Sequence, residues 1–471
     1  MMGEPTMFLH LLSLRPALGA VLLLASALGP AAPAQANGQA GGQAGGASDE
    51  PGALMAQAFD YAYPLVAMGR LRAASLGAGT DASPSPAWQH RRELADPARR
   101  EVTTPNVDTL YSLLWLDLRQ GPVELSLPDM AGRYHSLAFI DMVGNNFAML
   151  GRRLNGTRSS RHVLVGPDWP GPMPKAARVI RAPSNDVLVL ARILVDGPQD
   201  LPAVHALQDQ LVAQPLAAAP RPPVWDAAPP LGPTPQAFVD LANRMLERNP
   251  PPAYEQALLG RLAAVGLCGA ACAWDRLSPA LQAQWTQSLP TLLAGLKTAA
   301  FSAGRTVNGW RYGQANLGQF GTDYRYRAST ALSGLLALEP VESVYPSTGV
   351  DAQGLALSGA HRYRLRLPAG GLPVNAFWSL SMYEVEPDGR LFFSANALRR
   401  YAIGDRTPGL QVAADGAVDL TIQHEAPATP EQARNWLPAP QGAFRLVLRA
   451  YEPRAALLDG QITLPAVERL D

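Results

Sequence analysis

Short runs of alternating apolar and polar residues dominate the first half of the chain after about residue 105. Gly, Pro, Asn and Asp separate the runs, which read LYSLLWLDL, PVELSLPD, RYHSLAFIDMV, NFAMLGRR, HVLVG and DVLVLARILVD. Runs of this length, rich in β-branched or aromatic residues and bounded by turn residues, are typical of strands. The pattern therefore predicts an antiparallel sheet across residues 110–196.

Apolar residues recur with helical spacing on either side of these strands. The stretch 51–76 predicts a helix that Pro64 should kink or break near Tyr63. Residues 198–216 return to helical spacing. Thr234 is placed as an N-cap, with Pro235 at the first helical position. Further helices are expected over 234–249, 253–267, 278–304 and 322–338.

The alternation returns past Tyr345, in HRYRLRLPAG, NAFWSLSMYEV, AVDLTIQHEAP and FRLVLRAYEP. Strands at this spacing with turn signals between them predict a β-sandwich. The whole pattern predicts an α+β multidomain protein. Its parts are an N-terminal β-rich domain (52–216), a Pro-rich linker (217–235), a helical region (236–345) and a C-terminal antiparallel β-sandwich (346–471).

The N-terminus has the pattern of a secretory signal peptide. Arg15 precedes an apolar core over 17–28, and Ala34-Gln35-Ala36 fits the small-residue cleavage site. We predict cleavage after Ala36, a signal peptide over 1–36, a flexible linker over 37–51, and a periplasmic or secreted protein. The alternative is an uncleaved anchor. The apolar core is too short for a permanent membrane span.

Composition narrows the partners. The 471 residues are 47% hydrophobic, and 39 Lys and Arg balance 39 Asp and Glu. A balanced chain without a basic block predicts a globular protein with no nucleic-acid partner. The seven His have no metal-ligand spacing, and the common catalytic and nucleotide-binding motifs are missing. We predict no metal and no cofactor, and leave a homo-oligomer open.

The only cysteines, Cys268 and Cys272, are four residues apart. No His or second Cys pair flanks them, so a metal site is disfavoured. In an oxidising compartment, such a pair predicts a local disulfide with a small contribution to stability.

Polar residues gather among aromatic ones around residues 104–153. Asp108 and Asp141 are candidate catalytic residues, because two carboxylates sharing a cleft push their pKa values apart and can act as acid and base. The alternative is structural: an Asx turn at Asp108 and a hairpin turn at Asn145–Asn146. The candidate ligand-binding residues are Asn106, Thr109, Tyr111, Tyr134, Asn146, Arg153, Trp310, Tyr324, Arg327 and Arg406.

These stretches resemble bacterial proteins that pair domain of unknown function 1254 with domain of unknown function 1214. TPNVDTLYSLLWLDL and GRYHSLAFIDMVGNNFAMLGRR carry the likeness to the first domain, and NGWRYGQANLGQFGTDYRYRA, RRYAIGDRTPGL and FRLVLRAYEP to the second. The resemblance runs from about Met55 to Arg469. It implies an N-terminal β-rich domain, a helical middle and a C-terminal jelly-roll-like sandwich, and it implies no catalytic residues.

Two function classes follow. The first is an exported protein that binds a polar small molecule or glycan in a cleft, with hydrolysis left open; as an enzyme it would be a hydrolase or lyase. The alternative is a non-catalytic protein-interaction module of the cell envelope. The enzyme hypothesis requires Asp108 and Asp141 to lie within about 5–10 Å of each other.

Overall fold

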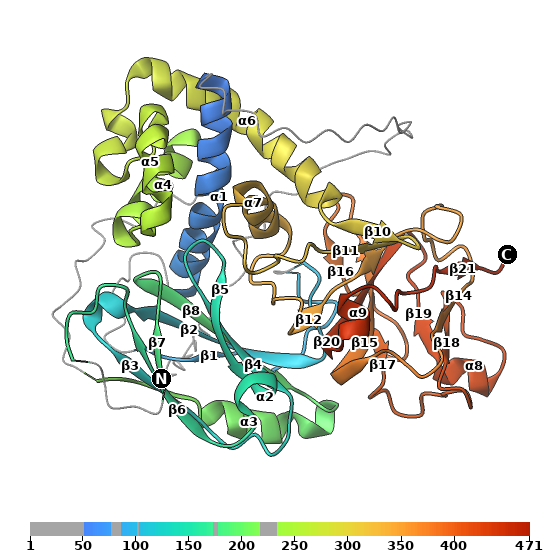
Figure 1. Ribbon diagram of the computed structural model, residues 1–471. Helices are drawn as coiled ribbons and strands as arrows, with labels where there is room; N and C mark the ends of the chain where they lie inside the picture. The colour runs from blue at the N-terminus through green and yellow to red at the C-terminus, as the bar shows by residue number, and fades with distance from the viewer. Residues whose placement is uncertain (1–50, 77–85, 101–102, 173–177, 217–232) are drawn as a thin grey trace, which may run out of the picture.

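The computed structural model describes residues 51–76, 86–100, 103–172, 178–216 and 233–471. The predicted signal peptide, the cleavage site after Ala36 and most of both predicted linkers lie outside these residues. The described chain forms a helical layer, an N-terminal β part and a C-terminal β part (Figure 1). None of the helices in the described ranges is long and apolar enough to cross a membrane.

The N-terminal β part consists of two sheets. Sheet A has the order β1-β2-β8-β4-β5 and sheet B the order β7-β6-β3-β9. The strands are β1 (Gln89–His90), β2 (Thr109–Asp117), β3 (Val123–Leu127), β4 (His135–Ile140), β5 (Asn146–Gly151), β6 (Ser160–Val165), β7 (Val179–Arg181), β8 (Asp186–Leu194) and β9 (Val212–Pro215). Short helices η1 (Leu118–Gln120), α2 (Arg152–Asn155), η2 (Pro198–Asp200) and α3 (Leu201–Asp209) connect them.

The strands predicted from the alternating runs are confirmed, and their pairing is antiparallel except for β6 with β7. One prediction in this region is wrong. The helix expected over 198–216 ends with α3 at Asp209, and β9 pairs with β3 at the edge of sheet B. Pairing with an existing edge overrides a local helical pattern, because it satisfies the backbone groups of both strands.

Alternation along β2 divides its side chains between two environments. Leu110 and Leu114 pack into the core between sheets A and B. Tyr111, Leu113 and Trp115 point to the opposite face and join a different core. Because side chains alternate with period two, one strand supplies both the inner core and a surface for the other units.

The helical layer contains α1 (Pro51–Leu76), α4 (Pro235–Arg248), η3 (Ala253–Glu255), α5 (Gln256–Leu262), η4 (Ala263–Val265), η5 (Gly269–Cys272), η6 (Trp274–Arg276), α6 (Pro279–Ser302) and α7 (Tyr324–Ser333). The N-cap prediction is confirmed, since the Thr234 hydroxyl accepts a hydrogen bond from the Ala237 amide. α1 continues through Pro64 without a break. Cys268 and Cys272 are joined by a disulfide.

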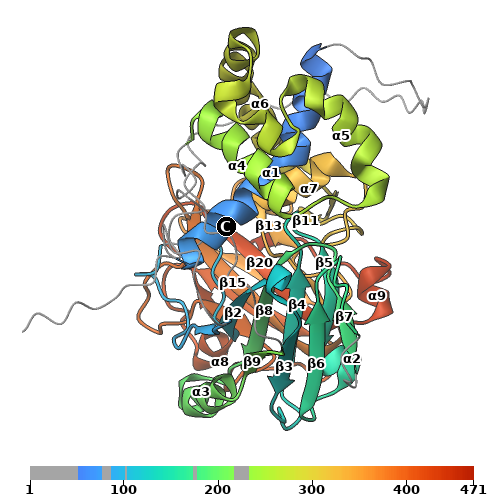
Figure 2. The same cartoon turned by 90° about the vertical axis from the view of Figure 1, so that its left-hand side faces the viewer.

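Although α1 precedes sheet A in the chain, it lies in the helical layer (Figures 1 and 2). Phe59 of α1 stacks on Phe238 of α4 with ring centres 5.4 Å apart. The chain therefore enters the helical layer, leaves it to form sheets A and B, and returns to it at α4.

The C-terminal β part contains an eight-stranded sheet, sheet C, and a four-stranded sheet, sheet D, with the order β19-β18-β14-β21. Leu365 of sheet D and Leu380 of sheet C belong to the core between them. The mixed α+β multidomain prediction is confirmed, while the jelly-roll topology stays a prediction. The elements are β10 (Arg305–Val307), β11 (Trp310–Tyr312), β12 (Ser343–Val344), β13 (Ser347–Thr348), β14 (Tyr363–Leu367), β15 (Val374–Val385), β16 (Leu391–Phe392), β17 (Ala402–Gly404), β18 (Val418–Gln423), α8 (Pro430–Arg434), β19 (Trp436–Pro438), β20 (Phe444–Pro453), α9 (Ala455–Leu458) and β21 (Glu468–Arg469).

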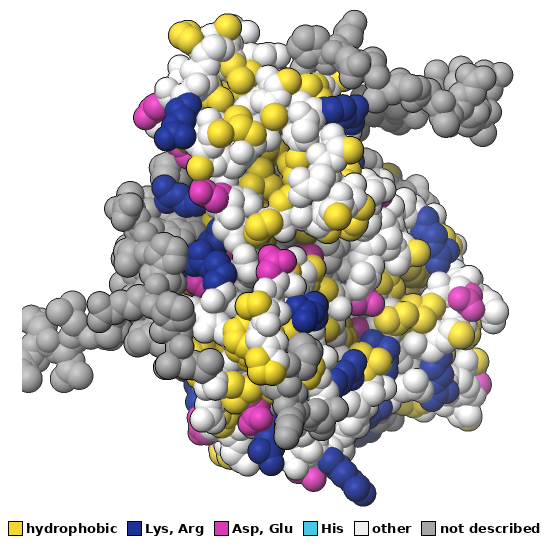
Figure 3. Space-filling model, turned by 60° about the vertical axis from the view of Figure 1, so that its left-hand side comes forward, with side chains coloured by type: hydrophobic (Ala, Val, Ile, Leu, Met, Phe, Trp, Pro, Cys, Tyr) yellow, Lys and Arg dark blue, Asp and Glu magenta, His cyan; other side chains and the backbone are white. Residues whose placement is uncertain are grey.

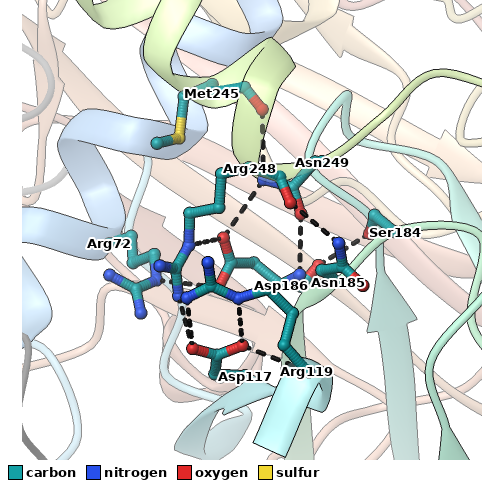
Figure 4. A network of polar contacts seen from close by, with 9 residues as sticks. All are labelled: Arg72, Asp117, Arg119, Ser184, Asn185, Asp186, Met245, Arg248 and Asn249. Atoms are coloured by element: carbon teal, nitrogen blue, oxygen red, sulfur yellow. Dashed lines mark hydrogen bonds and ion pairs between the residues drawn. The ribbon is translucent and has the colours of Figure 1, made fainter. Parts of the chain in front are cut away.

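A buried polar network fixes the helical layer to the end of sheet A where β8 begins (Figure 4). The fully buried Asp186 carboxylate accepts hydrogen bonds from Arg248, with Nη2 at 2.7 Å, and from Asn249 at 3.1 Å. Arg72 of α1 lies 3.3 Å from the same carboxylate, and Arg248 also reaches Asp117 at 2.8 Å. Two helices and two strands therefore share one set of buried charges.

One hydrophobic core joins all three units on the outer face of sheet A. It contains Leu113 and Leu190 of sheet A, Phe59 of α1, and Phe377 and Tyr451 of sheet C. Any site built on this face can therefore draw side chains from every part of the molecule.

Candidate functional site

The residues predicted to form one site lie in three places. Seven lie beside the start of β2, four near the opposite end of sheet A, and one in the core of the C-terminal part. The first group is Asn106, Asp108, Thr109, Tyr111, Tyr134, Arg153 and Arg406; the second is Asp141, Asn146, Tyr324 and Arg327; the third is Trp310.

The polar turn before β2 is made by Asn106. Its Oδ1 accepts hydrogen bonds from the backbone amides of Asp108 and Thr109, both at 2.9 Å. Its Nδ2 donates to the Tyr111 hydroxyl. An Asx turn is thus present, but Asn106 forms it, which leaves the Asp108 carboxylate available for other partners.

Asp108 joins the N-terminal and C-terminal β parts. Its carboxylate accepts a hydrogen bond from the Ser379 hydroxyl of β15 at 2.6 Å. Arg406, which follows β17, donates to the other oxygen at 3.1 Å. Arg406 also donates to the carbonyl of Val195 and lies over the Phe377 ring, 4.4 Å from its centre. With 3% exposure, Asp108 is a buried partner of a specific cation.

Asp108 and Asp141 do not form a pair. Asp108 precedes β2, whose first residue is opposite Leu194 of β8, and Asp141 follows β4, whose last residue is opposite Leu188. Six residues of β8 separate Leu194 from Leu188, and each Asp lies one residue further out. The two Asp residues are therefore eight residues apart along the strand direction, roughly 26 Å at about 3.3 Å per residue. An acid and base flanking one bond need about 5–10 Å. The predicted catalytic pair is therefore wrong.

Asp141 organises the turn between β4 and β5. Its Oδ1 accepts from the amides of Val143 at 3.0 Å and Asn145 at 2.9 Å, and its Oδ2 accepts from the Asn145 side chain. Burial raises the pKa of Asp141, and the Asn145 hydrogen bonds partly oppose that rise. The turn expected at Asn145–Asn146 exists, and Asp141 holds it.

The second group lies where β5 meets the segment after α7. The Asn146 amide donates to the Ala337 carbonyl at 2.9 Å. Arg327 is 1% exposed, and its guanidinium lies against the rings of Tyr61 and Tyr324, 5.0 and 4.8 Å from their centres. Its nearest carboxylate is Glu255, at 3.4 Å. Arg327 borders a small pocket whose other walls include Phe320 and Leu336.

Trp310 belongs to neither group. It is fully buried in the core between sheets C and D, and its indole N–H donates to the Pro465 carbonyl at 2.7 Å. A buried Trp with its N–H satisfied is a packing residue, so the ligand-binding prediction for Trp310 is wrong.

Arg153 and Tyr134 meet at one carboxylate. Glu342 accepts from Arg153 Nε at 2.7 Å and from the Tyr134 hydroxyl at 2.8 Å. The neighbouring Arg152 forms two hydrogen bonds of 3.1 Å with Glu452. Two successive arginines after β5 therefore tie the N-terminal part to the C-terminal part. Both guanidinium groups are engaged by these carboxylates, which favours a positioning role over ligand contact.

Tyr111 lies beside residues that were not among the predicted site residues. Arg192 of β8 pairs with it across sheet A, with the guanidinium 5.4 Å from the ring centre. Burial raises the pKa of the Tyr451 hydroxyl on β20, and the neighbouring Tyr345 and Tyr111 raise it further. We call this set, completed by two more charged residues, the junction cluster: Asp108, Tyr111, Arg192, Tyr345, Arg449 and Tyr451.

Some polar groups of the junction cluster have partners and others do not. Arg449 donates to the Ser381 hydroxyl at 2.8 Å and to the Thr104 carbonyl at 2.9 Å. Arg192 Nη2 donates to the Leu336 carbonyl at 2.9 Å, but Nη1 is buried with no partner among the described residues. Tyr451 is 1% exposed, and its ring stacks on that of Phe377.

Part of the junction cluster is accessible to solvent. Tyr111 and Tyr345 are half-buried, so the cluster keeps accessible surface. On the face shown in Figure 3, hydrophobic side chains gather over the helical layer, and basic and acidic side chains are interspersed. No three His, Cys, Asp or Glu side chains within the described ranges are placed to hold a metal ion.

One sequence signal could have identified Arg192. It is the single charged residue inside the apolar run VLVLARILV, and the burial of a charge in such a strand requires a reason. Tyr345, Arg449 and Tyr451 had no such signal, because only the packing of the C-terminal β part against sheet A brings them to Arg192 or Tyr111.

Comparison with protein families gives two matches. Residues 87–215 match the model of a protein of unknown function (DUF1254), and residues 342–455 match that of a protein of unknown function (DUF1214). The junction cluster draws three residues from the first segment (Asp108, Tyr111, Arg192) and three from the second (Tyr345, Arg449, Tyr451). The site therefore requires both segments.

Comparison with solved structures supports the fold. The chain is similar to the VPA0106 protein from Vibrio parahaemolyticus, with 23% identity and a TM-score of 0.70, over 89% of this chain and 100% of that one. A putative uncharacterized protein from Burkholderia cenocepacia aligns with 14% identity and a TM-score of 0.44, over 90% and 91% of the chains. A search of curated proteins finds no match. The first likeness shows a shared fold.

Proposed function

The chain pairs a DUF1254 domain with a DUF1214 domain, and from this premise we propose that it binds a polar small molecule at the junction cluster, where the two domains meet. The observation that carries the proposal is a buried hydrogen-bond donor without a partner. Arg192 Nη1 has no hydrogen-bond partner among the described residues. Burying such a donor without a partner is unfavourable, so a bound polar molecule that accepts from it would stabilise it.

The geometry favours binding over hydrolysis. Asp108 is held by Ser379 and Arg406, and Asp141 is held by the turn that it organises. The two carboxylates are much further from each other than acid–base hydrolysis of a glycosidic bond requires. The proposal is therefore a binding protein, and it does not include a reaction.

Export is part of the same proposal. The disulfide between Cys268 and Cys272 supports it, since disulfides persist mainly in oxidising compartments. The test is to express the full chain with a C-terminal tag and determine the N-terminus of the mature protein. A mature chain that begins at Asn37 in the periplasm or medium supports export, and a full-length cytoplasmic chain contradicts it.

The binding proposal is tested by thermal unfolding in the presence of sugars, polyols, amino acids, amides and organic acids. A ligand at 100 times its dissociation constant stabilises the folded state by about 2.7 kcal/mol, which is readily measured. We expect at least one class to raise the midpoint for wild type, and Tyr451→Phe, which removes only the hydroxyl, to weaken that effect.

The matched control is Tyr254→Phe, because Tyr254 is 65% exposed and lies outside the junction cluster. It should respond to the ligand as wild type does. If no compound raises the midpoint, or if Tyr451→Phe responds as fully as the control, the binding proposal fails and the interaction-module alternative is favoured.

A further inference from the structure

Charged side chains are buried at the interface between the two β parts. Three buried carboxylates face the interface within the described ranges: Asp108, Glu342 and Glu452. Three partly exposed arginines pair with them, Arg406 with Asp108, Arg153 with Glu342 and Arg152 with Glu452. Two further arginines, Arg192 and Arg449, are buried and form no ion pair with a carboxylate of the described residues. Asp196 and Asp405 lie near Arg406 but are exposed, so water screens their charge.

Arg192 is a buried guanidinium without a carboxylate partner among the described residues. It is 6% exposed, and the one hydrogen bond from its guanidinium goes to a neutral acceptor, the Leu336 carbonyl. The ionisable groups that act on it are tyrosines. Burial raises the pKa of Tyr345 and Tyr451, so both stay neutral at physiological pH and do not balance the charge. A buried cation without a counter-charge favours an anion beside it.

The surroundings of Arg192 limit the kind of anion. The ring of Tyr451 stacks on that of Phe377 at 4.3 Å, and Tyr134 meets both rings edge-on. Leu194 and Leu336 add partly buried apolar surface to the same core. A guanidinium edge matches a planar carboxylate in a bidentate manner, and the aromatic surface beside it suits an organic body. A ligand with an organic body and one compact anionic group matches this set.

We propose that the ligand of the junction cluster is a small organic carboxylate, whose carboxylate accepts hydrogen bonds from Arg192 Nη1 and the Tyr451 hydroxyl while its apolar part lies against the aromatic rings. This inference rests on the proposed function and names the class of its ligand. Tyr111 adds a third donor, because its hydroxyl oxygen accepts from Asn106 and its own proton stays available.

The test uses matched pairs of probes that differ in charge but hardly in shape: benzoate with benzamide, and propionate with propionamide. Sodium phosphate and sodium sulfate are the inorganic anions. Dissociation constants are measured by calorimetry at constant ionic strength. We expect each carboxylate to bind about tenfold or more tightly than its amide, because hydrogen bonds to a charged group are markedly stronger than neutral ones.

Arg192→Met should abolish the difference between carboxylate and amide. Arg364→Met should keep it, because Arg364 is an exposed residue of β14 paired with Glu468. If Arg192→Met does not fold, Tyr451→Phe provides the second measurement. It keeps the ring and its packing, and should weaken carboxylate binding several-fold, by about one hydrogen bond. Unchanged carboxylate affinity in a folded variant contradicts the inference.

The outcomes separate this inference from the proposed function. If sugars or amides bind in a manner that depends on Tyr451 and carboxylates do not, the carboxylate inference is wrong and the binding proposal stands. If phosphate or sulfate binds more tightly than every carboxylate, the ligand class is wrong. If no probe of any class binds, both are wrong.

Discussion

Arg248→Met tests whether the buried network in Figure 4 holds the helical layer on sheet A. The substitution removes the guanidinium and keeps most of the apolar side chain. Asp186, which is fully buried, then keeps Asn249 at 3.1 Å and Arg72 at 3.3 Å. Removing one partner of a buried ion pair costs about 3–5 kcal/mol. Because Arg72 still offsets part of the charge, we expect a loss at the lower end, about 3 kcal/mol.

The measurement is the free energy of unfolding in urea, which keeps the ionic strength low so that ion pairs are not screened. Arg364→Met is the control, since it removes an exposed partner of Glu468 and should change stability little. In the double variant with Asp186→Asn, the losses should be less than additive, because both substitutions act on one interaction. If Arg248→Met costs no more than Arg364→Met, the network does not hold the layer and the reasoning is wrong.

Three other predictions concern the described structure. Burial alone raises the pKa of Asp117, but two neighbouring guanidinium groups lower it overall, from 3.8 to about 2. The ionised Asp117 therefore stabilises the folded state fully above pH 3.8, and this contribution is lost as the pH falls through 2. The cost of Asp117→Asn, on the order of 2 kcal/mol, should shrink between pH 6 and pH 2.5 in urea titrations. Gly151 has φ +145°, and a Cβ there would lie 2.4 Å from the His135 carbonyl oxygen. Gly151→Ala should therefore lower the free energy of unfolding by about 3 kcal/mol. Gly132→Ala is the control and should cost clearly less, because its Cβ would have no neighbour within 4 Å. Opening the disulfide with Cys272→Ser should cost about 2 kcal/mol or less for so short a loop, and the urea midpoint of this variant should match that of reduced wild type.

Local sequence predicted the elements of this fold well where one pattern had one physical solution. The alternation in LYSLLWLDL predicts a strand, and β2 is that strand. Thr234 followed by Pro235 predicts a helix start, and the Thr234 hydroxyl caps α4. The helical spacing of residues 212–215 predicted a helix where the structure has β9, because the pairing of β9 with β3 is a non-local interaction that a local pattern does not contain.

The candidate site was predictable only in part, because it depends on distances between residues far apart in the chain. Asp108 and Asp141 are close in sequence and similar in setting, yet the register of β2, β8 and β4 places them at opposite ends of sheet A. Arg449 and Tyr451 are 257 and 259 residues from Arg192 in sequence, and nothing local links them.

The sequence by itself determined the strands, the helix caps, the close cysteine pair and the pairing of the two domains, because each depends on residues near one another along the chain or on long contiguous motifs. The tertiary structure alone decided which polar residues act together. Packing of sheet C against the outer face of sheet A joined Asp108 to Ser379 and Arg406, and brought Tyr451 to the buried charge of Arg192. The reason is physical: the partner of a buried charge is whichever group the fold brings within a few ångströms of it, at any separation in sequence.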